Sequence, residues 1–163
     1  MILVTLGTRG RFERLLKEID RLKETGEIKE KVIEQIANSD YIPKYVDEYF
    51  RYASLTKMKK LNENASMIIT HGGVGSIFTS FMYNKPTIVV PRYKKFNEHT
   101  DDHQLQITKE LEKEGKIIAV YDIKNLKNSI DKAKKFKKRE LPKKQERKNK
   151  LLKIISQYLE KIR

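Results

Sequence analysis

Short apolar runs that alternate with helical segments constrain this 163-residue chain more than any other feature. The runs lie at residues 2–6, 32–37, 67–70, 87–91 and 117–121, with a weaker one at 49–53. Those at 67–69 and 87–90 have almost no polar face, which is typical of strands covered by helices on both sides. Strands that alternate with helices favour an α/β fold, a Rossmann-like, doubly wound parallel sheet.

Helical periodicity fills most of the gaps between these runs. The apolar faces are formed by Phe12, Leu15, Leu16, Ile19 and Leu22, by Leu55, Met58 and Leu61, and by Leu105 and Leu111. Ser54 is a predicted N-cap for the second helix. Asp101 and Asp102 are expected in the first turn of the third helix, which should run to about Glu114 and end at Gly115.

The length predicts a single domain over residues 1–163, and no segment of it has the composition of a membrane span. The apolar run at the start is too short and too β-branched for a secretory signal. With no cysteine, the chain can have neither disulfides nor thiolate chemistry. We therefore expect a cytoplasmic protein.

Basic residues are concentrated at the C-terminus. The net charge is +14, and residues 132–163 hold 14 basic and three acidic residues, so this segment supplies +11. We interpret it as a basic helical extension whose partner is a nucleic acid or an anionic membrane surface, or else as a solvated face. Its apolar stripe would pack on the domain itself, on a partner or on a membrane, and comprises Leu151, Leu152, Ile155, Tyr158, Leu159 and Ile162.

A glycine-rich turn, THGGVGS at residues 70–76, follows the apolar run at 67–69 and opens a predicted helix. Ligands of doubly wound sheets bind at this position, where glycines let the backbone approach a phosphate and the helix dipole favours negative charge. The segment lacks the lysine of a P-loop, and Phe78 stands where GxGxxG requires its third glycine. The turn therefore predicts phosphate binding; the alternative is a tight turn without a ligand.

A polar cluster follows the run at 87–91. Asp102, His103 and Gln104 offer donors and acceptors suited to sugar hydroxyls, although they could also be solvent-facing residues of a capped helix. His99 and His103 are spaced i, i+4, but the segment is not a His-Glu-x-x-His motif and Lys94 and Lys95 lie nearby, so we expect no metal.

Together, these motifs resemble the glycosyltransferase family 28 C-terminal domain in its stand-alone form. The resemblance rests on GT at 7–8, THGGVGS at 70–76, KPTIVVPR at 85–92 and EHxDDHQ at 98–104. It is greatest to small subunits of two-component glycosyltransferases, of the dolichol-linked N-acetylglucosaminyltransferase and bacterial exopolysaccharide types. It implies the C-terminal, donor-binding half of a GT-B fold.

The resemblance also implies a function and a site. The chain would be a hexosyltransferase subunit that binds a UDP-sugar without a metal or other cofactor. A membrane-anchored subunit would bind the lipid-linked acceptor and bring the chain to the cytosolic face of the membrane. The implied donor site comprises Gly7, Thr8, His71, Gly72, Gly73, Gly75, Ser76, Thr79, Asp102, His103 and Gln104. Many family members have Glu at the position of Thr79, so the donor sugar is not specified.

Two other functions are considered. One is a non-catalytic subunit that enhances a catalytic partner, which Thr79 makes more credible. The other is a basic nucleic-acid-binding protein, which the charge favours but no recognised motif supports. The general base stays unassigned, since His71, His99, His103 or the partner could supply it.

Overall fold

The computed structural model describes residues 1–8 and 10–135, and the single positions 149, 153, 156 and 160. Over this part the chain forms a fully parallel six-stranded sheet with the order β3-β2-β1-β4-β5-β6. The strands are β1 (Ile2–Thr5), β2 (Val32–Gln35), β3 (Glu48–Phe50), β4 (Met67–His71), β5 (Thr87–Val90) and β6 (Ile118–Ala119). The predicted Rossmann-like doubly wound sheet is confirmed, and its order reverses between β1 and β4.

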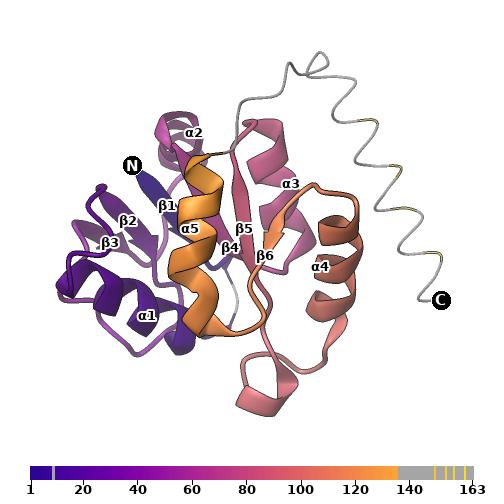
Figure 1. Cartoon of the computed structure of the whole chain (residues 1–163), viewed down its shortest axis with the longest axis horizontal. Coiled ribbons are helices and arrows are strands. Elements are labelled where there is room, and N and C mark those ends of the chain that lie inside the picture. Colours follow the sequence, from indigo (N-terminus) through magenta and orange to yellow (C-terminus); the bar gives the residue numbers. More distant parts are fainter. Residues whose placement is uncertain (9, 136–148, 150–152, 154–155, 157–159, 161–163) are drawn as a thin grey trace.

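Helices cover both faces of the sheet. They are α1 (Glu13–Glu24), α2 (Leu55–Asn64), α3 (Val74–Met82), α4 (His103–Lys113) and α5 (Leu126–Lys134), with short 3-10 helices η1 (Lys94–Phe96) and η2 (Ile123–Asn125). In Figure 1, α1 and α5 lie in front of the sheet, while α2 and α3 lie behind it. Connections of this kind between parallel strands bring the loops after β1, β4 and β5 to one edge.

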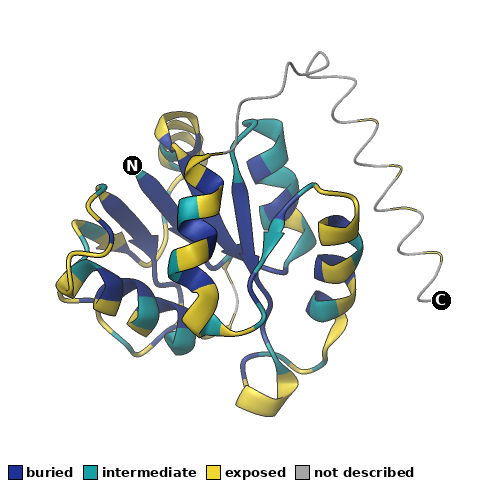
Figure 2. Cartoon of the chain, viewed as in Figure 1, coloured by how far each residue is buried: buried dark blue, intermediate teal, exposed yellow. Residues whose placement is uncertain are grey.

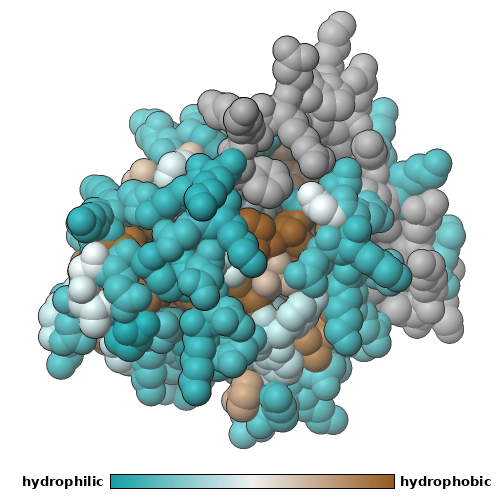
Figure 3. Space-filling view, in the orientation of Figure 1, coloured by the Kyte–Doolittle hydropathy of each residue, from teal (hydrophilic) through white to brown (hydrophobic). Residues whose placement is uncertain are grey.

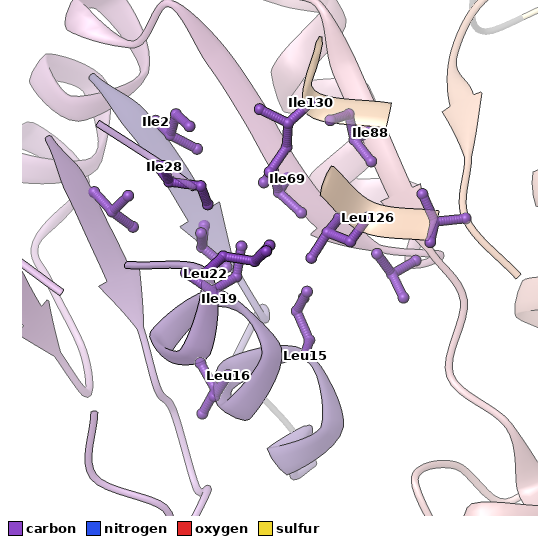
Figure 4. Packing of buried hydrophobic residues seen from close by; sticks show 14 of the residues in the cluster. Ile2, Leu15, Leu16, Ile19, Leu22, Ile28, Ile69, Ile88, Leu126 and Ile130 are labelled. Carbon is purple, nitrogen blue, oxygen red and sulfur yellow. The ribbon is translucent and has the colours of Figure 1, made fainter. Parts of the chain in front are cut away.

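Each central strand contributes to cores on both faces. In β1, Ile2 and Val4 pack with Leu15 of α1 and Ile130 of α5, whereas Leu3 packs into a separate cluster behind the sheet. Figure 2 shows these strands as buried, and Figure 4 shows the front cluster between the sheet, α1 and α5. The lack of a polar face in the sequence is thus explained by burial from both sides. On the face drawn in Figure 3, the surface is mostly hydrophilic, with an apolar area between α5 and α4.

The helix ends agree with the sequence in part. Ser54 is the N-cap of α2, where its hydroxyl accepts a hydrogen bond from the Lys57 N–H at 3.2 Å. Gly115 follows α4 with φ +64°, and its N–H donates to the Glu112 carbonyl. The predicted start of α4 was wrong, because Asp101 and Asp102 precede its first residue.

The expected apolar face of α2 also needs correction, since Leu55 is 91% exposed and only Met58 and Leu61 pack on the core. Leu55, the first residue of α2, is therefore not part of the cluster on which Met58 and Leu61 pack. The apolar stripe predicted for the last helix lies outside the described residues. The four single positions described there have helical backbone and exposed side chains. In the part that the structure describes, no helix is long and apolar enough to span a membrane.

Candidate functional site

A cleft of about 990 Å³ lies at the carboxyl ends of β1, β4 and β5, where the strand order reverses. Parallel α/β sheets bind ligands at this position because loops and helix N-termini converge there. Eight of the eleven predicted site residues line the cleft: Gly7, Thr8, His71, Gly73, Gly75, Ser76, Thr79 and Gln104. Gly72, Asp102 and His103 are not part of its lining.

His71 ends β4 and fits tightly between two glycines. A Cβ atom added to Gly73 would lie 2.2 Å from His71 Nε2, and one added to Gly7 would lie 2.9 Å from His71 Cε1. Gly7 also has φ +71°, a conformation that other residues rarely adopt. Both glycines therefore make room for the imidazole ring of the protein itself.

Gly72 is also required by packing within the protein. Its Cβ position lies 2.7 Å from Gln104 Cβ, so a side chain there would collide with α4. Gln104 Oε1 accepts hydrogen bonds from the N–H groups of Gly72 and Arg92, both at 3.1 Å. Gln104 thus ties the end of β4 to the end of β5, and its oxygen already has two donors.

Gly75 differs from these three glycines. Nothing lies within 4 Å of its Cβ position, and it has an ordinary helical conformation in the first turn of α3. The helix begins at Val74 without a side-chain cap, and the N–H groups that open a helix lack the regular intrahelical partner. That of Ser76 already donates to the Gly73 carbonyl at 3.1 Å, so the donors left for a ligand are those before it. Ser76, in the same turn, also lines the cleft. The turn therefore presents N–H donors, a hydroxyl and the positive end of a helix dipole to the open cleft.

Thr79 lies one turn further along α3. Its hydroxyl donates a hydrogen bond of 2.8 Å to the Gly75 carbonyl. The proton of this hydroxyl is therefore used in a hydrogen bond within α3. Thr79 still lines the cleft, and its hydroxyl oxygen can accept a hydrogen bond from a ligand.

The cleft floor holds a neutral imidazole and a buried cation. Burial, reinforced by the positive charge of Arg92, lowers the pKa of His71 to about 3, so the ring is uncharged at neutral pH and a weak base. Burial also lowers the pKa of Arg92, to about 10, which leaves its guanidinium charged. Arg92 Nη2 donates to the Leu6 carbonyl at 3.1 Å, and its guanidinium packs over the Phe12 ring. A charged group held in this low-dielectric floor favours an anionic ligand.

Residues of the segment after β5 form the side of the cleft that faces α3, and the donor site predicted from the sequence did not include them, although His99 was considered as a possible general base. This side comprises Asn97, Glu98, His99 and Thr100, next to Arg92 of the floor, and Gly10 and Arg11 join it from the loop after β1. Arg14 of α1 fixes this segment through two hydrogen bonds to Glu98, at 2.8 and 2.9 Å. The signal that could have found them is their position after a buried strand, because all such loops share one edge.

Asp102 and His103 have local roles in the structure. Asp102 Oδ1 accepts the N–H of Lys94 at 3.0 Å, and His103 Nδ1 lies 2.8 Å from Asp101 Oδ1. Asp101 also pairs with His99, and together these contacts shape the turn before α4. Among the described residues, no group of three or more acidic or histidine side chains is arranged to hold a metal.

Comparison with solved structures places this fold among glycosyltransferases of the GT-B type. The crystal structure of the glycotransferase of kitacinnamycin has a TM-score of 0.59 and 16% identity, covering 96% of this chain and 39% of that one. The glycosyltransferase SnogD from Streptomyces nogalater has a TM-score of 0.54 and 17% identity, covering 95% and 39%. The solution structure of ALG13 has a TM-score of 0.56 and 18% identity, covering 84% and 86%. These likenesses define the class: a Rossmann-like domain of the kind that forms half of a GT-B enzyme.

The chain belongs to the glycosyltransferase family 28 C-terminal domain family, whose model matches residues 1–158. It is also 37% identical over 82 residues to the UDP-N-acetylglucosamine transferase subunit ALG13 of Candida albicans. That match covers 50% of this chain and 26% of the relative, so the chain spans about a quarter of that protein. The family predicted from the sequence motifs is confirmed.

Proposed function

We propose that this chain is the donor-binding subunit of a hexosyltransferase that uses a UDP-sugar. A membrane-anchored partner subunit would bind a lipid-linked acceptor, and transfer would occur at the cytosolic face of the membrane. Family membership supports glycosyl transfer, and the name of the Candida albicans relative, a UDP-N-acetylglucosamine transferase subunit, supports both the donor class and the need for other subunits.

The observation that carries the proposal is the contrast among the glycines around the cleft. Gly7, Gly72 and Gly73 are explained by contacts with side chains of the protein, whereas the Cβ position of Gly75 faces open space. A glycine costs helix stability, so a helical glycine without an internal reason favours a ligand that needs close access to the backbone. A diphosphate resting on Gly75 and Ser76 would meet helix N–H groups, a hydroxyl and the charge of Arg92.

The chemistry follows from this placement. Loss of UDP in the transfer step leaves negative charge on the diphosphate, and the N-terminus of α3 with Arg92 would stabilise that charge without a metal. We propose inverting transfer, in which an acceptor hydroxyl displaces UDP from the opposite face of the sugar. The low pKa of His71 makes it a weak base at neutral pH. We therefore propose that the general base, which takes the proton of the acceptor hydroxyl, is on the partner or among the other residues of the cleft.

Calorimetric titration with UDP and UDP-N-acetylglucosamine tests donor binding directly. Ser76→Ala should weaken binding of both ligands, by about ten- to a hundred-fold for one lost hydrogen bond to a charged group. Ser66→Ala is the matched control, since Ser66 lies before the amino end of β4 and its hydroxyl donates to the Met1 carbonyl. Absence of UDP binding, or equal effects of the two variants, would refute the proposed site.

Gly75→Ala separates binding from folding. The added methyl group meets no protein atom, so thermal stability should be kept or increased while UDP binding falls at least ten-fold. Retained binding in this variant would place the diphosphate elsewhere. A panel of other UDP-hexoses then identifies the donor sugar, which the sequence leaves open.

A non-catalytic role is the second candidate, because the Thr79 hydroxyl donates to the Gly75 carbonyl and no carboxylate stands at its position. Reconstitution with the partner subunit distinguishes the two roles. A catalytic donor subunit with Ser76→Ala should lose transfer in parallel with UDP binding. An enhancer subunit would support transfer equally well in both forms.

A further inference from the structure

The loop after β5 has an exposed tip that combines aromatic and basic residues. Residues 93–96 read Tyr-Lys-Lys-Phe and include η1, and we call them the Tyr93–Phe96 tip. Figures 1 and 2 show this short 3-10 helix projecting from the body below β5, with exposed residues. Phe96 is 51% exposed, and Lys94 and Lys95 are exposed as well. A large aromatic ring at a projecting point exposes apolar area that a globular domain would otherwise bury.

The tip is held in place by hydrogen bonds. Asn97 adopts the left-handed conformation with φ 55°, and its N–H donates to the Lys94 carbonyl at 2.9 Å. At the base of the tip, the Tyr93 hydroxyl donates to the Tyr121 carbonyl at 3.0 Å, and Glu98 accepts the Tyr93 N–H at 3.1 Å. Arg14 in turn holds Glu98. The phenylalanine is thus presented by an ordered scaffold, which reduces the entropy lost when it meets a surface.

The chemistry of the tip matches a lipid–water interface. Lys95 Nζ lies 5.0 Å from the Tyr93 ring centre and 4.9 Å from that of Phe96, and the two rings meet edge to face at 5.5 Å. Rings of this kind settle at headgroup level, while lysine stems lie along them and their ammonium groups reach lipid phosphates.

The acidic neighbours of the tip are engaged by the loop. Asp102 accepts the backbone N–H of Lys94, and Asp101 pairs with His99 and His103. These contacts hold the two carboxylates in the turn before α4, while the side chains of Lys94 and Lys95 are exposed at the tip. The net charge of +14 adds long-range attraction to any anionic surface.

We propose that the Tyr93–Phe96 tip docks on an anionic lipid surface, with the Phe96 ring among the headgroups and Lys94 and Lys95 on lipid phosphates. The residues that immediately follow the tip, Asn97 to Thr100, line the cleft, so docking brings the cleft to the membrane. The proposal concerns residues 93–96 and relies neither on the basic C-terminal segment nor on a partner subunit. It also stands apart from donor binding, which is measured without vesicles.

The absence of tryptophan from the sequence provides a direct test. Phe96→Trp in the full chain places a single indole at the tip, and Tyr49→Trp places the control indole on β3, where Tyr49 is 46% exposed. With vesicles of phosphatidylcholine and phosphatidylglycerol, we expect a blue shift for Phe96→Trp and quenching by lipids brominated on their acyl chains. The Tyr49→Trp emission should not change, and pure phosphatidylcholine should give no shift.

Vesicle co-sedimentation of the full chain measures the contribution of the lysines while leaving the C-terminal segment intact. Lys94→Ser and Lys95→Ser should each weaken binding to anionic vesicles roughly five-fold. The control is Lys59→Ser, which changes an exposed lysine on α2. Unchanged Phe96→Trp emission, or equal losses at Lys59 and the tip, would overturn the proposal and favour a protein or nucleic-acid partner for this surface.

Discussion

Glu34 offers the sharpest test of the energetics of this fold. It lies in β2 with no exposed area, and neither of its carboxylate oxygens has a hydrogen-bond partner in the described structure. Burial, followed by repulsion from Asp20, raises the pKa of Glu34 well above its ordinary value of 4.5. Burial acts to raise the pKa of Asp20 as well, but hydrogen bonds from Tyr41 and from backbone N–H groups hold it below its ordinary value. Glu34 is therefore protonated in the folded state over a pH range in which it ionises in the unfolded chain.

The sign of the pH dependence follows from this difference. Above pH 4.5 the folded state binds one more proton than the unfolded state, so the free energy of unfolding falls as the pH rises. The slope is at most about 1.4 kcal/mol per pH unit, which limits the loss between pH 4.5 and pH 7 to roughly 3 kcal/mol. Glu34→Gln has a similar shape and no proton to lose. It should match the wild type near pH 4.5 and become more stable than it as the pH rises.

Urea denaturation from pH 4.5 to 7.5 measures this difference, and the contributions of titrating groups that do not interact with Glu34 cancel between wild type and variant. Glu114→Gln, at an exposed position after α4, is the control and should show a nearly constant difference. A constant difference for Glu34→Gln, or a variant that loses stability relative to wild type as the pH rises, would refute the reasoning about this buried carboxyl.

Three further substitutions test individual contacts. Gly73→Ala forces a Cβ atom against His71 and should lower the free energy of unfolding by about 1–3 kcal/mol in urea titration, whereas Gly75→Ala should not lower it. Asp20→Asn removes a carboxylate that accepts several hydrogen bonds and should cost about 1.5–3 kcal/mol at pH 7; the cost should shrink as the pH falls below 3.8, which acid titration of both proteins would reveal. Ser54→Ala removes the N-cap of α2 and should cost about 1 kcal/mol, or 2–4 °C in Tm by calorimetry. A Ser54→Ala variant with unchanged Tm would show that the first turn of α2 does not depend on its cap.

The sequence by itself determined the architecture of this protein. Apolar runs without a polar face and helical periodicity between them are local patterns, and they predicted the parallel sheet that the structure contains. The motifs also identified the family, which the comparison confirms. The cap at Ser54 and the helix end at Gly115 were predictable for the same reason, because each depends on residues within one turn.

Only the tertiary structure decided what each residue of the site touches. The sequence could not show that Gly7 and Gly73 make room for His71, or that Gly72 packs against Gln104, because these contacts join segments on different strands and helices. For the same reason it missed Arg92 in the cleft floor and the raised pKa of the buried Glu34. Residue spacing along the chain defines turns and helix faces, whereas burial, close packing and electrostatics depend on which distant segments meet. Among Gly7, Gly72, Gly73 and Gly75, only Gly75 has no protein atom near its Cβ position, so it alone is open to a ligand.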